Sequence, residues 1–313
     1  MAALLLASLP RIAYRCVSDE CFARAASVSA RSGSSTKAPG DADPACPPAI
    51  LSIFTASAVG EWRNLYATLR QLQLHSLMIA FVLDADAAAT AKAEGARVRS
   101  EFASDAVAAA TEAPYGSASF KSVNAIKLKA LNVLLDEGHI VFYLDCDVVV
   151  LRDFVSHFFT LPPRDVYLQS DEVHFGSASR YCTGVMFLRP TPASKALVHD
   201  AQTQLQALRC KVGDVDAHCT DQEAINEAIK HAVDSTHAAE GIRLRVDALA
   251  PADYPNGAHY FGEPIDKNDP YFVDARARAS CSTPPMLVHN NWLNGRRNKV
   301  TRLQLHNLWF VSR

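Results

Sequence analysis

Two aspartates at the end of an apolar segment are the residues of this sequence whose types and spacing best suit chemistry. Ile140–Leu144 has the length and hydrophobicity of a buried strand, and Asp145, Cys146 and Asp147 follow it directly. Because residues i and i+2 of an extended chain face the same side, both carboxylates project together while Cys146 points into the core. Adjacent carboxylates repel each other unless a divalent cation lies between them, and oxygen ligands suit Mg²⁺ or Mn²⁺. The pattern predicts a metal site, against the alternative of a solvent-exposed turn at a strand end.

A second candidate segment, near the C-terminus, supplies an imidazole, a glycine and several cations. A short apolar run leads into His289, Gly295 permits close backbone approach, and Arg296 and Lys299 stand at the start of an expected final helix. Such a group can hold a diphosphate, and an imidazole beside two carboxylates favours Mn²⁺ over Mg²⁺. A single histidine is more often a core residue and a basic run is usually solvated, so the prediction rests on the combination.

An α/β fold is expected to position these segments. Ile50–Thr55 is a strand-length apolar run, Trp62–Leu72 has apolar residues at helical spacing, and Leu77–Leu83 is again apolar. A strand, a helix and a strand of this kind indicate a parallel sheet that helices cover on both faces. Ligands of such sheets bind at the carboxyl ends of the strands, which is where Asp145 and Asp147 stand.

The rest of the chain continues the alternation of helices and strands. Residues 1–48 show little periodicity and are expected to be a disordered or leader tail, so the folded domain is expected over 49–313. Gly138 is expected to end a helix in a left-handed conformation. The other expected elements are a helix near 85–94, a polar loop near 100–119, a helix from Ile126 to Leu135, strands near 166–169 and 184–188, a helix-rich stretch at 191–232 and an ordered loop at 250–272.

Composition excludes several classes of protein. Lys and Arg number 31 against 33 Asp and Glu, a net charge of -2, so no electrostatic drive toward nucleic acid is expected. No apolar run approaches the ~18 residues that a membrane-spanning helix needs. The cysteines form no Cys-x-x-Cys motif, which argues against a zinc ribbon. A Cys210–Cys219 disulfide would suit an oxidising compartment, whereas buried free thiols would suit a reducing one. The spacing of the cysteines does not decide between these two compartments.

Asp145 has a competing interpretation as the nucleophile of a haloacid-dehalogenase-like phosphatase, whose first motif is similar. Those chains usually open with the strand that carries this motif, whereas here a complete strand-helix-strand unit precedes it. The later acidic motif would have to be Gly213–Asp216, which follows a helix instead of a strand. A non-catalytic carbohydrate-binding protein is the other alternative. Such a protein would be expected to have lost Asp145, Asp147 or His289, and all three are present.

Four segments taken together resemble the ordered motifs of one family. They are Tyr143–Asp153, Cys182–Pro190, Asp221–Asn226 and His289–Lys299. They look like those of the nucleotide-diphospho-sugar transferase family, retaining glycosyltransferases of the GT-A fold that include plant and algal xylosyl-, galactosyl- and arabinosyltransferases. The resemblance extends from about residue 49 to the C-terminus. It implies a single GT-A-like α/β domain with a Rossmann-like mixed sheet and helices on both faces.

The resemblance also implies roles for individual residues at the donor site. Asp147 would be the principal metal ligand, Asp145 would contact the donor ribose or the metal, and His289 would complete the metal site. Gly295 and Lys299 would hold the diphosphate of the donor.

Five further residues are expected around the donor phosphates and sugar. Lys127 matches a recurrent basic position of the family and would reach the donor phosphates, with a solvated helix lysine as the alternative. Thr183 and Gly184 would border the donor sugar. Asp221 and Gln222 would lie under the anomeric carbon or contact the acceptor, although Asp221 could instead be an N-cap carboxylate.

The resulting expectation is a retaining glycosyltransferase that uses Mn²⁺ or Mg²⁺ and a nucleotide-diphosphate sugar, with UDP as the expected nucleotide. The acceptor is expected to be a glycan or glycoprotein hydroxyl. An amide is a poor nucleophile, so front-face attack is favoured, with Gln222 stabilising the oxocarbenium-like state.

Family members usually carry an N-terminal signal anchor, which is not recognisable here. The expected location is the Golgi or the secretory-pathway lumen, with membrane association only if an anchor is missing from this chain.

Overall fold

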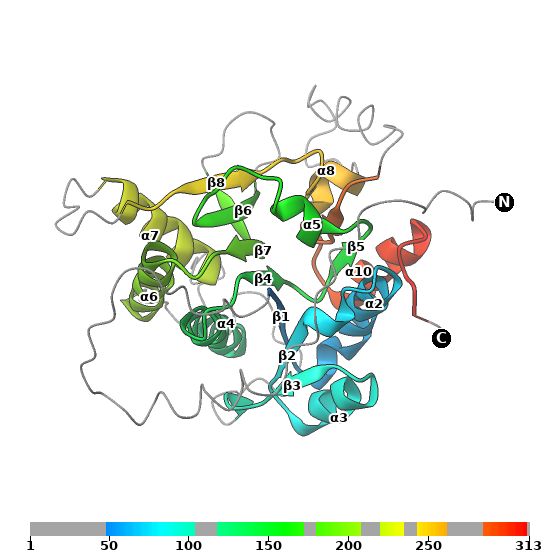
Figure 1. Cartoon of the computed structure of the whole chain (residues 1–313). Coiled ribbons are helices and arrows are strands. Elements are labelled where there is room, and N and C mark those ends of the chain that lie inside the picture. The colour runs from blue at the N-terminus through cyan, green and yellow to red at the C-terminus, as the bar shows by residue number, and fades with distance from the viewer. Residues whose placement is uncertain are drawn as a thin grey trace. The chain divides into compact units, whose positions relative to one another are not determined.

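Seven strands form one mixed sheet in the part of the chain that the computed structural model describes, in the order β3-β2-β1-β4-β7-β6-β8 (Figure 1). The described residues are 48–103, 118–171, 180–207, 220–234, 243–261 and 284–311. The strands are β1 (Ala49–Phe54), β2 (Met78–Val82), β3 (Arg97–Arg99), β4 (Val141–Leu144), β6 (Val166–Ser170), β7 (Tyr181–Leu188) and β8 (Val246–Leu249). The expected tail over 1–48 lies almost wholly outside these residues and stays a prediction.

The centre of the sheet is parallel, as the apolar strands indicated. β1 pairs in parallel with β2 on one side and with β4 on the other, and β7 then runs antiparallel to β4. All residues of β1, β2 and β4 are buried, which suits strands covered on both faces. The sheet is therefore mixed, as the family resemblance implied.

Helices cover both faces of the sheet and build a separate core on each. The two-residue period of β4 sends Val141 and Tyr143 into one core and Phe142 and Leu144 into the other. The first core includes side chains of α4, α6 and α7, and the second those of α2, α3 and α5. In Figure 1, α4, α6 and α7 lie together, away from α2 and α3. The helices are α2 (Val59–Gln71), α3 (Ala85–Ala93), α4 (Ala118–Asp136), α5 (Phe154–Phe158), α6 (Pro192–Ala207), α7 (Asp221–Asp234), α8 (Gly257–Phe261) and α10 (Arg296–Leu305), with 3-10 turns η1 (Ala56–Ala58) and η2 (His75–Leu77).

The turn at Gly138, between α4 and β4, directs the chain into the strand that leads to the predicted site. Gly138 has a φ of 87°, and its backbone N–H donates to Leu135 while that of His139 donates to Leu134. The expected left-handed glycine at the end of this helix is therefore confirmed. The chain can turn directly into β4, whose carboxyl end carries Asp145.

A two-stranded antiparallel ribbon beside the main sheet was not predicted. β5 (Val148–Val150) pairs with β9 (Leu287–His289), and Val148 lies opposite His289. Although a strand before His289 was expected, its partner was not, because three valines after two aspartates carry no signal of a distant pairing. β3 and β8 were also missed.

The expected loop at 250–272 is partly wrong. Residues 257–261 form the short helix α8, and residues 262–272 lie outside the described part of the chain. Among the described residues, none of the helices combines the length and hydrophobicity that a bilayer crossing needs.

Candidate active site

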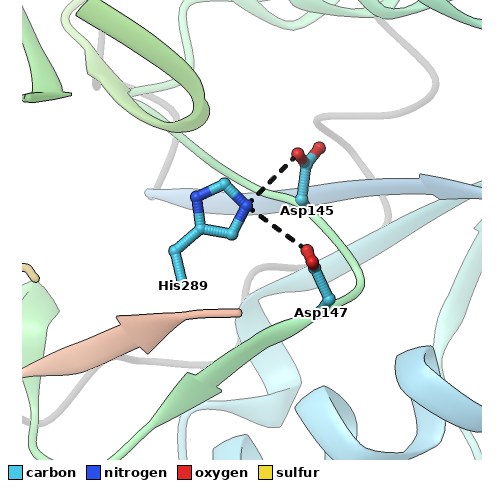
Figure 2. Close-up of side chains that lie close together, drawn as sticks. All are labelled: Asp145, Asp147 and His289. Atoms are coloured by element: carbon cyan, nitrogen blue, oxygen red, sulfur yellow. Dashed lines mark ion pairs between the residues drawn. The ribbon is translucent and has the colours of Figure 1, made fainter. Parts of the chain in front are cut away.

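Asp145, Asp147 and His289 lie together where the main sheet meets the ribbon (Figure 2). Both aspartates belong to the turn between β4 and β5, and the pairing of β5 with β9 brings the histidine beside them. The His289 Nε2 atom is 3.6 Å from a carboxylate oxygen of Asp145 and 3.4 Å from one of Asp147. Adjacent ligands of an octahedral ion with bonds of ~2.1 Å are about 3.0 Å apart, so these three atoms could hold a divalent cation after small movements.

The other ring nitrogen of His289 is held by a residue that the sequence analysis missed. His289 Nδ1 lies 2.7 Å from the side-chain oxygen of Gln169, which is fully buried in β6. The Gln169 amide nitrogen donates to the backbone carbonyls of Tyr254 and Pro255, at 3.1 and 3.0 Å. The available signal was a polar glutamine in a strand whose other buried residues are Val166, Tyr167 and Leu168. These contacts leave Nε2 as the nitrogen that faces the aspartates.

The charges of this cluster balance one another. Burial alone would raise the pKa of Asp147, but the nearby Lys299 and His289 outweigh it and hold the pKa well below its usual range. Lys299 Nζ lies 2.7 Å from Asp147. Burial would lower the pKa of His289, but Asp147 raises it to about 10. The site therefore stabilises positive charge in front of its two carboxylates, as a cation site should.

Lys127 connects the predicted metal ligands with the predicted catalytic pair. Its Nζ lies 2.7 Å from Asp221 and 3.7 Å from Asp145, and it stands 4.1 Å from the centre of the Tyr143 ring. Burial would lower the pKa of Lys127, but the carboxylates of Asp145 and Asp221 outweigh it and raise the pKa. Lys127 is buried, so the alternative of a solvated helix lysine is wrong.

The start of α7 corrects the alternative role of Asp221. The backbone N–H of Glu223 donates to the Thr220 hydroxyl oxygen, and the Glu223 side chain accepts from the Thr220 N–H and hydroxyl. This reciprocal pattern is a capping box, with Thr220 as the N-cap residue. Asp221 is thus not the N-cap, and its carboxylate is directed to Lys127 instead.

Gln222 points away from Asp221 toward the end of β6. Its side-chain nitrogen donates to the carboxylate of Asp171 at 2.8 Å. Burial raises the pKa of Asp171 above its usual value, although Arg180 and Gln222 oppose this. Asp171 was not singled out in the sequence, since Asp171 has no second acid two residues later, the spacing that marked Asp145 and Asp147.

Gly184 lies against the cluster, in β7. A Cβ atom at this position would stand 2.1 Å from His289 Cε1 and 2.7 Å from an oxygen of Asp145. The Gly184 carbonyl also accepts from the Asp145 backbone N–H. A glycine is needed here because the imidazole occupies the space of a side chain. Its neighbour Thr183 is buried in the same strand.

The segment after His289 carries the predicted diphosphate residues. Gly295 has a φ of 84° and precedes α10, and Lys299 follows in the first turns of that helix. Asn290, also missed in the sequence, is fully buried; it donates to the Lys299 carbonyl and accepts from Arg302. The loop is thereby held so that Lys299 faces Asp147.

Comparison with known proteins identifies the class to which this fold and site belong. The model of the family described as nucleotide-diphospho-sugar transferase matches residues 73–303. The chain therefore belongs to that family, and the resemblance drawn from the four motifs is confirmed. Membership argues against the phosphatase interpretation, whose later motif, Gly213–Asp216, lies outside the described residues.

Several characterised proteins are similar to this chain. UDP-D-xylose:L-fucose alpha-1,3-D-xylosyltransferase 1 of Arabidopsis thaliana is 24% identical over 212 residues, 63% of this chain and 53% of that protein. UDP-galactose:fucoside alpha-3-galactosyltransferase of Dictyostelium discoideum is 25% identical over 214 residues, 63% of this chain and 29% of that protein. The chain thus spans about half, or less, of the length of these relatives.

A solved structure supports the expected architecture. The apo form of glycosyltransferase GlyE from Streptococcus pneumoniae superposes with a TM-score of 0.52 at 13% identity, covering 85% of this chain and 61% of that one. This likeness concerns the fold. Together with the mixed sheet and the helices on both faces, it bears out the predicted GT-A-like α/β domain.

Proposed function

We propose that this chain is a metal-dependent, retaining glycosyltransferase that moves a sugar from a UDP-sugar to a hydroxyl of a glycan or glycoprotein. The observation that carries the proposal is the convergence of Asp145, Asp147 and His289 at the carboxyl end of β4, next to Lys299. Two similar proteins are named for UDP-xylose and UDP-galactose, which supports UDP as the nucleotide of the donor.

The donor set of the site suits a divalent cation. Two carboxylates and one imidazole nitrogen would hold it, and this mixture of oxygen and nitrogen ligands favours Mn²⁺ over Mg²⁺. Such an ion, when bound, supplies positive charge that stabilises a departing diphosphate. Lys299 adds a second positive charge, and Gly295 lets the backbone at the start of α10 approach the phosphates.

Retention of configuration follows in our proposal from the groups around Lys127. Asp221 is buried in an ion pair with this lysine, which makes its carboxylate a poor nucleophile. We therefore favour attack of the acceptor hydroxyl on the face that the diphosphate leaves. The acceptor oxygen forms the new bond to the anomeric carbon, the bond to the phosphate oxygen breaks, and that oxygen takes the hydroxyl proton. Gln222 stabilises the positive charge that develops on the sugar.

The decisive experiment measures UDP binding by calorimetry with and without Mn²⁺. Asp147→Ala should abolish the Mn²⁺-dependent part of the affinity, whereas Asp86→Ala, which removes an exposed acid of α3, should leave it unchanged. Circular dichroism of both variants checks that the fold is kept. UDP affinity in Asp147→Ala equal to that of the unaltered protein, with Mn²⁺ and with EDTA, would overturn the proposal.

We also propose that the protein works in the Golgi or elsewhere in the secretory-pathway lumen. The support is the family resemblance. Expression of a tagged full-length protein, followed by protease protection of isolated membranes, tests it, because a luminal protein is digested only after detergent is added.

A further inference from the structure

We propose that Gln169 is a positioning residue that fixes the orientation of His289 so that Nε2 faces Asp145 and Asp147. The inference deepens the proposed function and rests on the metal site at its centre. Gln169 contacts Nδ1 of His289, the ring nitrogen that does not face the aspartates. It would therefore influence metal binding only through the orientation of the imidazole.

The orientation of the Gln169 amide is determined by its surroundings. Its nitrogen donates to two backbone carbonyls, of Tyr254 and Pro255, and a carbonyl can only accept. The amide oxygen must therefore be the atom at 2.7 Å from His289 Nδ1. Because this oxygen is an acceptor, Nδ1 carries a hydrogen and donates it, and in a neutral imidazole the free lone pair is then on Nε2.

The other neighbour of His289 Nδ1 is the Cys182 sulfur, at 3.6 Å. This sulfur also receives the Gly184 backbone N–H and the Asn291 amide. Because these donors occupy its lone pairs, Cys182 does not decide which ring nitrogen carries the hydrogen. The position of the hydrogen is set by the shorter contact with the Gln169 oxygen.

The backbone of β6 is shaped to present Gln169 to the histidine. The pairing of β6 with β7 shifts register between Leu168 and Gln169, so that Leu168 lies opposite Met186 and Gln169 opposite Cys182. Such bulges redirect side chains and are common next to active sites. The Pro255 carbonyl that accepts from Gln169 also accepts from the His289 backbone N–H, so both residues are anchored to one atom.

Two substitutions of Gln169 test the role through metal binding, with no turnover required. Gln169→Met is close in volume and removes the amide. Gln169→Asn keeps an amide for the carbonyls but is one methylene too short to reach them and His289 together. Each should weaken Mn²⁺ binding by about 10- to 100-fold, the usual effect of losing a residue that orients a metal-bound histidine. Titration of Mn²⁺, with free ion measured by electron paramagnetic resonance, gives the affinity.

The matched control is Tyr254→Phe. It leaves the Tyr254 backbone carbonyl in place but removes the hydroxyl that pairs with His157, so Mn²⁺ affinity should be unchanged. Electron spin echo spectroscopy of bound Mn²⁺ adds a readout that a merely structural role would not change. The nitrogen coupling of the coordinated imidazole should weaken in both Gln169 variants and persist in Tyr254→Phe.

The outcomes separate this inference from the proposed function. If the unaltered protein binds no Mn²⁺, the proposed metal site fails and the role of Gln169 fails with it. If Asp147→Ala loses Mn²⁺ but Gln169→Asn binds it with unaltered affinity and nitrogen coupling, the proposed function stands and the role of Gln169 is refuted.

Discussion

The ion pair of Lys127 and Asp221 shows how a single buried charge depends on its partner. Both side chains are 6% exposed, and their charged atoms are 2.7 Å apart. A buried pair of this kind adds little stability compared with apolar residues, but removal of one partner leaves the other charge without compensation. The pair therefore holds α4 and α7 together, because separating them would leave a buried charge without its partner.

We predict that Lys127→Met lowers the free energy of unfolding by about 3 kcal/mol, since it leaves the Asp221 carboxylate unpaired. The double variant Lys127→Met/Asp221→Asn should recover much of that loss. Urea unfolding followed by circular dichroism measures both. Lys230→Met, which breaks an exposed pair with Glu227, is the control and should have little effect. Equal losses in the single and double variants would show that burial of charge is not the cause.

Gly184 gives a second prediction for a single residue. Gly184→Ala would place a methyl group 2.1 Å from His289, so the imidazole must move and Mn²⁺ affinity should fall at least ~10-fold. Gly60→Ala is the matched control, because its Cβ would make only an ordinary contact, 3.7 Å from Trp309. In the helix α2 this alanine should even stabilise the protein, by up to about 1 kcal/mol. Undiminished Mn²⁺ binding by Gly184→Ala would mean that His289 is not a ligand.

Among the secondary-structure elements, the edge of the sheet is held by one carboxylate. Asp165 precedes β6, and its oxygens accept from the backbone and guanidinium N–H groups of Arg245, which precedes β8. Its own carbonyl accepts from Arg189, which follows β7. Three strands are thus joined at Asp165.

This contact predicts a pH dependence of stability. Burial would raise the pKa of Asp165, but the hydrogen bonds from Arg245 outweigh it and lower the pKa below its unfolded value of about 3.9. The carboxylate therefore stabilises the fold above that pH, and the contribution disappears as the pH falls through the lower folded-state value. Asp165→Asn should be less stable than the unaltered protein at pH 7, and the difference should shrink below about pH 4. Urea unfolding across this range measures it; a difference that stays constant contradicts the assignment.

Elements differ in how far the sequence alone predicts them. The strands β2 and β4 could be predicted because each is a continuous apolar run, and β1 because it is apolar except for Ser52. Asp145 and Asp147 followed from their spacing at the end of β4. The β5–β9 ribbon could not, since its register depends on a partner far along the chain. Gln169 was missed for the same reason: its role is visible only once β6 lies beside His289.

At the scale of the whole folded unit, the last described residues are attached to α2, the first α-helix of the described part. Asn64 of α2 is buried; its amide nitrogen donates to the Leu308 carbonyl, and its oxygen accepts from the Phe310 N–H. Leu303 and Leu308 pack with Val149 and Val288 in a small core of their own. α10, which carries Lys299, is docked by these contacts.

We predict that Asn64→Ala lowers the free energy of unfolding by about 1–3 kcal/mol, because it removes both hydrogen bonds of a buried side chain. Hydrogen exchange should accelerate most in the segment 296–311, and much less in β1 and β4. Arg63→Ala, on the exposed side of the same helix, is the control and should leave exchange in that segment unaltered. Uniform acceleration across the sheet would show that Asn64 does not act on the docking of α10.

The pairing of Lys299 with Asp147 joins residues 152 positions apart, and this separation bears on biosynthesis. The pairings of β1 with β2 and β4 involve only residues up to Tyr143, so they can form while the later chain is still being made. The cluster cannot, because His289 and Lys299 leave the ribosome long after the aspartates do. A nascent or prematurely terminated chain can thus form the parallel centre of the sheet while it still lacks this cluster. Under the proposed function, only a chain translated beyond Lys299 carries the complete donor site.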